Sequence, residues 1–300
     1  MARPDAGIGD RHPTVAGAVR QAAVELQGAG IHDVGTDARR LVGAALGLSA
    51  AELLSRPERP LSAAEAERLR CYVDRRRRRE PVSRILGARD FYGRSFAISP
   101  ATLDPRPDSE TLIAAVLELV RSEGRTSAPL RLLDVGTGSG CLLLTLLCEL
   151  PLATGVGTDI NQSALQVARA NACRLGVAER AAWLVADALD GIAGNFDILV
   201  ANPPYVRSGE IAALEPEVRD FDPVAALDGG ADGLNLYRRI AAGIRTVVAD
   251  GWVVLEVGHD QADAAAELLA SNPRAIDRGE LRFYRDVTGR RRCVAVRTQS

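Results

Sequence analysis

Residues 131–140 read RLLDVGTGSG and decide the fold of most of the chain. The first five residues are a short apolar run of the kind that forms a buried strand, and a helical pattern continues from the last glycine to Leu150. Asp134 lies at the end of the run, and Gly136, Gly138 and Gly140 form the turn between strand and helix. This order predicts the first unit of an α/β sheet, with a ligand at the turn.

The alternation of apolar runs and helical patterns continues after this unit. Helical patterns occupy 162–176 and 234–244, between runs typical of strands. Such alternation predicts an α/β fold with a doubly wound, mostly parallel seven-stranded sheet, whose last two strands are antiparallel. Ligands of these sheets bind beyond the carboxyl ends of the strands, where the strand order reverses. The predicted strands are 131–135, 155–160, 181–187, 196–201, 251–258, 281–287 and 291–297.

The chain divides into four segments of different pattern. Helical periodicity dominates before residue 85, and DFYGRSFAIS at 90–99 alternates apolar and polar residues as a two-stranded hairpin does. The predicted segments are a flexible tail at 1–12, a small helical domain at 13–84, a hairpin and linker at 85–105, and the α/β domain at 106–300.

Several helix starts are marked by side chains. Ser49 and Ser62 are each followed three residues later by glutamate, which is the capping-box pattern. Asp108 or Ser109 is expected to cap the helix that begins near residue 110. Arg106 and Asp108 either line a substrate entrance or support that helix start.

The composition excludes several classes of chemistry. All 37 basic residues are arginine, so there is neither a Schiff-base lysine nor a P-loop lysine. The five cysteines lack CxxC spacing and only three histidines occur, so we expect no metal site and buried, reduced thiols. The first residues lack the apolar segment of a signal peptide, and the most apolar run is too short to span a bilayer. We expect a cytoplasmic protein without a membrane partner.

Charge is distributed unevenly along the chain. Residues 1–80 carry 14 arginines and 11 acidic residues, whereas residues 81–300 carry 23 arginines and 28 acidic residues. Proteins that bind a nucleic-acid backbone usually have a basic excess, so the larger part does not favour nucleic acid as a partner. The run Arg75–Arg79 is either a solvated helix end, which the helix dipole favours, or a patch for an acidic partner or RNA.

The glycine turn differs from one that binds a nicotinamide dinucleotide. That motif, G-x-G-x-x-G, needs glycine where Cys141 stands. The spacing G-x-G-x-G after an acid suits a ligand without pyrophosphate, and S-adenosylmethionine carries an ammonium and a sulfonium that Asp134 can meet. Asp159 is expected to bind ribose hydroxyls, and Asp187 to reach adenine. The expected cofactor residues are Asp134, Gly136, Thr137, Gly138, Ser139, Gly140, Asp159, Asp187, Ala188 and Asn202.

The motif NPPY at 202–205 comes directly after the strand run FDILVA. Proline cannot continue a central strand because it has no N–H for the ladder, so the two prolines end the strand and stiffen the loop after it. The motif is therefore either a rigid turn or a preformed cup that holds a flat nitrogen group. Glu256 and His259 lie at another strand end, where a loop role is favoured over a catalytic one.

Six segments come in an order typical of one enzyme family. They are EPVSRILGARDFYG (80–93), SPATLDPRPDSETL (99–112), DVGTGSG (134–140), NPPY (202–205), LDGGADGLNLYRRI (227–240) and RDVTGRRRCV (285–294). The chain resembles the class I S-adenosylmethionine-dependent methyltransferases, and more narrowly the release factor glutamine methyltransferases (the HemK/PrmC family). The resemblance covers nearly the whole chain, and the segment PRPDSE is more specific than NPPY.

The resemblance implies a Rossmann-like fold and transfer of a methyl group from S-adenosylmethionine to a glutamine side-chain nitrogen. That glutamine lies in the Gly-Gly-Gln motif of class I peptide chain release factors, and the helical domain would contact the factor. The implied catalytic residues are Asn202, Pro203, Pro204 and Tyr205: the Asn202 side-chain oxygen and the Pro203 carbonyl accept the two amide hydrogens, and Tyr205 packs on the amide. Family members often have an aromatic residue at the position of Ala188, which puts adenine stacking there in doubt.

Two other functions are compatible with these residues. A nucleic-acid methyltransferase that acts on the exocyclic amine of adenine or guanine would use the same hydrogen bonds, with Arg75–Arg79 as its anchor. A binding protein that has kept the fold would use its helical domain for association and transfer no methyl group.

Overall fold

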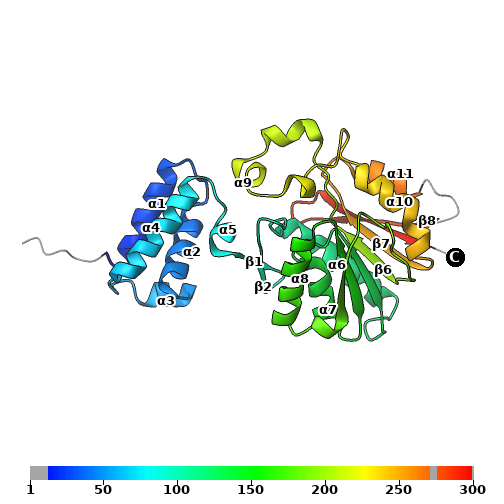
Figure 1. The fold of residues 1–300 in the computed structure, drawn as a ribbon, viewed down its shortest axis with the longest axis horizontal. Helices are drawn as coiled ribbons and strands as arrows, with labels where there is room; N and C mark the ends of the chain where they lie inside the picture. Colours follow the sequence, from blue (N-terminus) through cyan, green and yellow to red (C-terminus); the bar gives the residue numbers. More distant parts are fainter. Residues whose placement is uncertain (1–12, 271–275, 299–300) are drawn as a thin grey trace, which may run out of the picture. The chain divides into compact units, whose positions relative to one another are not determined.

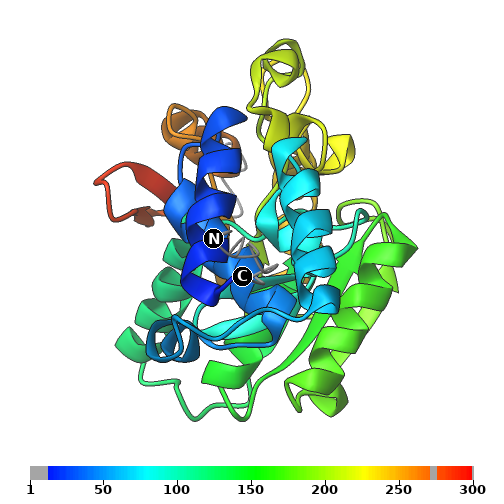
Figure 2. The ribbon, with the colours of Figure 1, turned by 90° about the vertical axis from the view of Figure 1, so that its left-hand side faces the viewer.

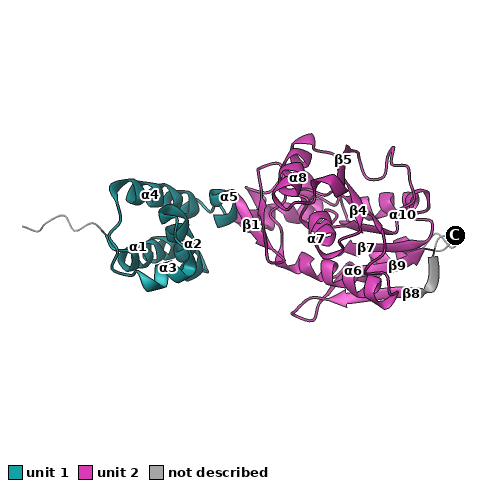
Figure 3. Cartoon of the chain, turned by 90° about the horizontal axis from the view of Figure 1, so that it is seen from below, with its two compact units in different colours: residues 1–86 teal, residues 87–300 magenta. Residues whose placement is uncertain are grey.

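The computed structural model describes residues 13–270 and 276–298. The chain forms two compact units, residues 1–86 and residues 87–300 (Figure 3). The tail expected at 1–12 lies outside the described residues.

The first unit is a helical bundle with its own apolar core (Figures 1 and 2, blue to cyan). Leu26 of α1, Leu41 of α2 and the loop residue Leu61 are almost completely buried in this core. Both predicted capping boxes are confirmed, with Ser49 and Ser62 accepting bonds from the backbone N–H of the glutamate three residues later. The helices of this unit are α1 (Val15–Gly28), α2 (Val34–Leu46), α3 (Ala50–Ser55), α4 (Ala63–Arg77) and α5 (Val82–Leu86).

The arginine run at the end of α4 is engaged by acidic neighbours of the same unit. Arg75 Nε donates to Glu80 at 2.8 Å, and Arg76 Nε donates to Asp37 at 2.7 Å. Arg77 pairs with Asp74, one turn earlier in α4. Because these pairs use the charge of part of the run within the protein, they weaken it as an anchor for a nucleic acid.

The second unit contains the predicted seven-stranded sheet, in the order β5-β4-β3-β6-β7-β9-β8. The first five of these strands are parallel, and β9 runs antiparallel to both β7 and β8, as predicted. The order reverses between β3 and β6, whose last residues Val135 and Ala201 are in register. The strands are β3 (Arg131–Val135), β4 (Thr154–Asp159), β5 (Ala181–Val185), β6 (Ile198–Ala201), β7 (Gly251–Glu256), β8 (Ile276–Arg285) and β9 (Arg291–Thr298).

Helices cover both faces of this sheet, as a doubly wound fold requires (Figure 1). Successive strand residues point to opposite faces, so Leu132 joins the core under α6 and α7, whereas Leu133 joins the core under α10 and α11. The helices are α6 (Glu110–Ser122), α7 (Cys141–Glu149), α8 (Gln162–Arg174), α9 (Pro216–Arg219), α10 (Asn235–Val247) and α11 (Ala262–Ala270), and 3₁₀ turns include η1 (Pro107–Ser109), η3 (Ser208–Ala213) and η4 (Val224–Ala226).

A hairpin of β1 (Ala88–Phe91) and β2 (Arg94–Ala97) precedes the sheet. Tyr92 and Gly93 have φ of 48° and 70°, as a two-residue hairpin turn requires. The Asn171 side chain in α8 bonds both backbone groups of Ala97 and also donates to the Ser139 carbonyl at 2.9 Å. This side chain therefore ties the hairpin to the glycine turn.

Two local predictions were wrong. Neither Asp108 nor Ser109 caps α6 through its side chain, because Asp108 pairs with Arg292 and the Ser109 hydroxyl accepts a bond from Asn202. The five cysteines are free but not uniformly buried, since Cys71 and Cys173 are exposed. Within the part of the chain that the structure describes, no helix is long and apolar enough to cross a membrane, and no three His, Cys, Asp or Glu side chains form a metal-binding group.

Candidate active site

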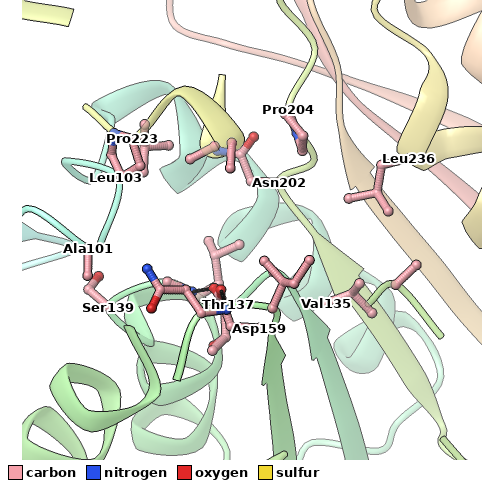
Figure 4. A pocket seen from close by; sticks show the side chains of 18 of the residues that line it. Ala101, Leu103, Val135, Thr137, Ser139, Asp159, Asn202, Pro204, Pro223 and Leu236 are labelled. Carbon is pink, nitrogen blue, oxygen red and sulfur yellow. Dashed lines mark hydrogen bonds between the residues drawn. The ribbon is translucent and has the colours of Figure 1, made fainter. Parts of the chain in front are cut away.

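A cavity of about 320 Å³ lies at the carboxyl ends of the parallel strands, where the strand order reverses (Figure 4). Its volume is within the range of small-molecule sites. Thr137, Ser139 and Asp159 lie on one wall, opposite Asn202 and Pro204 (Figure 4). Of the residues predicted from the sequence, those that line the cavity are Gly136, Thr137, Gly138, Ser139, Asp159, Asp187, Ala188, Asn202 and Pro204.

Asp134 and Gly140 lie behind this wall and do not line the cavity. The Asp134 carboxyl group is fully buried, and one oxygen accepts a bond of 2.6 Å from the Thr137 hydroxyl. The other oxygen has no hydrogen-bond partner among the described residues. Burial raises the pKa of Asp134 to about 7. Asp134 therefore reaches the cavity only through Thr137, and its carboxyl group is only partly ionised at neutral pH.

Asp159 links the second strand to the glycine turn. One carboxylate oxygen accepts from the Gly138 N–H at 2.9 Å and the other from the Asn161 N–H at 2.8 Å. Each oxygen has a second lone pair, so the side chain can still accept from a ligand. Burial raises the pKa of this carboxyl group.

Asp187 and Ala188, which follow β5, also line the cavity. The Asp187 carboxylate accepts a bond of 2.6 Å from Arg239 of α10, which also bonds the Asp187 carbonyl and Asp190. Ala188 has φ of 55°, a conformation that side chains larger than glycine rarely adopt. Such strain often occurs where the chain is shaped around a ligand.

Asn202 presents its amide at the end of β6. Its Nδ2 donates to the Ser109 hydroxyl oxygen at 3.1 Å, which leaves Oδ1 as an acceptor. Ser109 also lines the cavity and is almost completely buried. The site therefore has a carboxamide whose donor side is engaged within the protein.

Pro203 and Tyr205 do not line the cavity. The Tyr205 ring packs against the core below α10, and its carbonyl accepts from the Gln261 side chain at 2.9 Å. Burial raises the pKa of Tyr205 to about 12, so this side chain stays protonated at neutral pH. These contacts hold the NPPY loop in place.

Comparisons with known proteins bear on both units. Residues 17–87 match a family model described as the PrmC N-terminal domain, and residues 114–215 match the methyltransferase small domain. The release factor glutamine methyltransferase of Bradyrhizobium diazoefficiens is 44% identical over 88% of this chain and 89% of its own. That of Rhodospirillum rubrum is 45% identical over 93% of this chain and 83% of its own. The chain belongs to the release factor glutamine methyltransferase family.

The fold of this methyltransferase also occurs in distant enzymes. The hMettl16 catalytic domain, solved in complex with the MAT2A 3′UTR hairpin 1, superposes with a TM-score of 0.52. It is 15% identical, and the likeness covers 83% of this chain and 84% of that one. Identity this low shows the class I methyltransferase fold alone.

Three features of the methyltransferase cavity are compatible with S-adenosylmethionine. Gly136 and Gly138 have positive φ, and a Cβ added to either would project into open space, so the backbone itself forms the wall. The Ser139 hydroxyl is buried on this wall without a hydrogen-bond partner among the described residues. Asp159 keeps acceptor capacity beside them, which suits ribose hydroxyls.

Many residues that line the methyltransferase cavity were not predicted from the sequence, and Ile160, Ser109 and Arg239 are the three used below. Ile160 is 63% exposed although it comes directly after a buried strand, and it lines the cavity next to Asp159. A large apolar side chain directly after a strand-end acid is a signal that was available. Ser109 and Arg239 had no local signal, because their partners Asn202 and Asp187 are distant in sequence.

Proposed function

We propose that this methyltransferase transfers a methyl group from S-adenosylmethionine to the side-chain amide nitrogen of the glutamine in the Gly-Gly-Gln motif of class I peptide chain release factors. The observation that carries the proposal is the position of Asn202 on the cavity wall, where its Nδ2 donates to the Ser109 hydroxyl oxygen and its Oδ1 is left as an acceptor. Membership of the release factor glutamine methyltransferase family supports the choice of substrate.

The glycine turn and the neighbouring strand ends would hold the cofactor. Gly136, Thr137, Gly138 and Ser139 supply backbone and hydroxyl contacts, and Asp159 accepts from ribose hydroxyls. Asp187 and Ala188 border the adenine, and Ile160 offers it an apolar surface in place of an aromatic ring. When bound, S-adenosylmethionine supplies an electrophilic methyl group on a sulfonium. Asp134, which is partly ionised at neutral pH, accepts from Thr137 behind this wall.

Asn202 and its loop would orient the substrate amide. An amide nitrogen is a poor nucleophile because its lone pair is delocalised into the carbonyl. Asn202 Oδ1 accepts one of its two hydrogens. Pro203 is not itself a lining residue but lies between Asn202 and Pro204, which are, and its carbonyl is the acceptor proposed for the second hydrogen. The prolines hold both acceptors with little reorganisation. Orientation of this kind lowers a barrier by several kcal/mol. Tyr205 supports the loop from the core.

The helical unit would contact the release factor. It has an apolar core of its own, and its arginine run is partly neutralised by Glu80, Asp37 and Asp74. These pairs favour a protein partner over a nucleic-acid backbone, for which unpaired cations are needed.

Methyl transfer from labelled S-adenosylmethionine to a purified class I release factor tests the proposal. We expect label on the natural factor and none on a factor whose Gly-Gly-Gln glutamine is replaced by alanine. Label on both factors would place the reaction at another atom. Label on RNA or DNA, and on neither factor, would replace the proposal by exocyclic-amine methylation.

A further inference from the structure

Glu256 is a buried acid that the proposed reaction does not use. It ends β7 beside the end of β6, because Leu255 is in register with Ala201. Its side chain is fully buried, and neither carboxyl oxygen has a hydrogen-bond partner within the described residues. A buried carboxyl group without partners is costly, so its retention next to Asn202 calls for a functional explanation.

Ser109 and Asn202 are polar side chains that neighbour the Glu256 carboxyl group. Asn202 directly follows Ala201, the register partner of Leu255, and it is bonded to Ser109, so both side chains lie beside the Glu256 carboxyl group without being hydrogen-bonded to it in the structure. Burial raises the pKa of Glu256 to about 7, and these two polar neighbours oppose the rise. Ser109 Oγ accepts from Asn202 Nδ2 at 3.1 Å. The Ser109 hydroxyl proton is therefore still to be donated, and Glu256 is the acceptor at hand.

We propose that Glu256, acting through Ser109, is a positioning residue that keeps the Asn202 amide turned with Oδ1 toward the substrate. The inference rests on the proposed function, since it explains how the acceptor for the substrate amide is oriented. An asparagine amide fits its site in two orientations of nearly equal shape, and only its hydrogen-bond partners select one.

The ionisation state of Glu256 makes the selection. An ionised carboxylate only accepts, so Ser109 must donate to it and must accept from Asn202 Nδ2. Oδ1 then faces the cavity. A protonated Glu256 can donate to Ser109, which frees the Ser109 proton for Asn202 Oδ1 and allows the amide to turn over. The ionised form is therefore the active one, and turnover rises as the pH passes upward through the pKa of Glu256.

Other ionisable groups surround Glu256 and contribute to this titration. Arg292 lowers its pKa and Asp108 raises it. Burial first, and then the negative charge of Glu256, raises the pKa values of Tyr205, Tyr237 and Cys293. Burial and the charge of Asp134 raise the pKa of Cys141, and Glu256 makes a smaller contribution. The groups that face it from the elements packed against it are Asp108 of η1, Cys141 of α7, Tyr205 after β6, Tyr237 of α10, and Arg292 and Cys293 of β9.

Turnover with a release factor is the first test. We expect wild-type kcat to rise about tenfold between about pH 6 and pH 8, with an unchanged KM for S-adenosylmethionine. Glu256→Gln should equal the wild type at the lower pH and stay at that value at the higher one. Glu267→Gln, in α11 outside the cavity, is the matched control and should behave as the wild type. Wild-type turnover in Glu256→Gln at both values would overturn the inference.

The orientation of Asn202 is the second test, and it needs neither cofactor nor release factor. In protein labelled with ¹⁵N-asparagine, the Asn202 side-chain NH₂ signals, identified by their loss in Asn202→Asp, should shift with a midpoint at about pH 7. The shift should vanish in Glu256→Gln and in Ser109→Ala, while both variants still unfold in one cooperative thermal transition. A shift that persists in Ser109→Ala would overturn the relay through Ser109.

The two tests separate the inference from the proposed function. If the Asn202 signals titrate as expected but no release factor is methylated, the proposed substrate fails and the positioning role stands for another acceptor. If release factor is methylated but the Asn202 signals do not titrate, the function stands and the role of Glu256 fails.

Discussion

Asp134 and Glu256 are both fully buried acids at strand ends of one sheet, yet their surroundings are assembled differently. Asp134 is bonded by Thr137, three residues further along the same turn. Glu256 is surrounded by Ser109, Asn202 and Arg292, which come from three separate segments. Burial raises the pKa of each to about 7.

The difference separates a local site from a topological one. The turn that contains Asp134 is a continuous motif, so it can bind a ligand wherever a strand and a helix flank it. The surroundings of Glu256 exist only after β6, β7 and β9 have come together in the sheet. A variant in the first wall should therefore alter cofactor affinity, and one in the second should alter turnover.

Asn202→Ala gives the most direct test of whether the second wall affects turnover and leaves cofactor affinity unchanged. We expect turnover with release factor to fall about a hundred- to thousandfold, because the acceptor for the substrate amide is lost. The affinity for S-adenosylmethionine, measured by calorimetry, should stay near that of the wild type. Asn195→Ala, which changes an exposed asparagine outside the cavity, is the control. Turnover of Asn202→Ala at the wild-type rate would remove Asn202 from the mechanism.

The two buried acids should also make stability depend on pH. Their pKa values in the folded protein, about 7, exceed the ordinary values of 3.8 for Asp134 and 4.5 for Glu256. The folded state therefore keeps protons that the unfolded state has lost, and this contribution to the free energy of unfolding is lost as pH rises through about 7.

Denaturant unfolding at about pH 5 and pH 8 measures this effect. We expect the pH-dependent loss in Asp134→Asn to be smaller than in the wild type by on the order of a few kcal/mol, since each unit of pKa corresponds to about 1.4 kcal/mol. Glu256→Gln should differ in the same direction. Identical pH dependence in the wild type and Asp134→Asn would show that Asp134 is not the source.

The close packing around Gly140 of the glycine turn can be tested by replacing this residue with alanine. Gly140 has φ of 80°, and a Cβ there would lie 2.9 Å from Leu144 and 3.2 Å from Ala168. Gly176 has φ of 72° with nothing within 4 Å of its added Cβ. Alanine should cost about 1 kcal/mol at Gly176 through strain alone, and about 2–3 kcal/mol at Gly140 through strain and overpacking. Equal losses, measured by thermal unfolding, would show that the close contacts relax freely.

Asp159→Asn should have the smallest effect, confined to the cofactor side. It replaces a charged acceptor of two backbone N–H groups, so we expect affinity for S-adenosylmethionine to fall about tenfold. kcat at saturating cofactor should be nearly unchanged, in contrast to Asn202→Ala. Asp263→Asn, on the exposed surface of α11, controls for loss of a charge. A large fall in kcat for Asp159→Asn would show that the two walls do not have separate roles in binding and turnover.

The sequence predicted well those features that depend on neighbours along the chain. The run 131–135 is β3 as predicted, and Gly136 and Gly138 line the cavity because a strand–turn–helix motif determines its own geometry. Predictions were poorer where distant segments compete for a side chain. Ser109 is bonded to Asn202, 93 positions away, instead of capping α6. The Tyr205 ring lies against the core because the sheet offers it apolar contacts there.

The antiparallel strand β9 has a consequence for the order in which the site becomes complete. A ribosome produces the glycine turn more than a hundred residues before Arg292 and Cys293, and β9 can pair with β7 only afterwards. Domains generally fold as units, and a nascent chain that ends before β9 lacks a strand that lies between β7 and β8 in the sheet. We therefore expect the two walls of the cavity to become complete together, only after the C-terminal strand has left the ribosome.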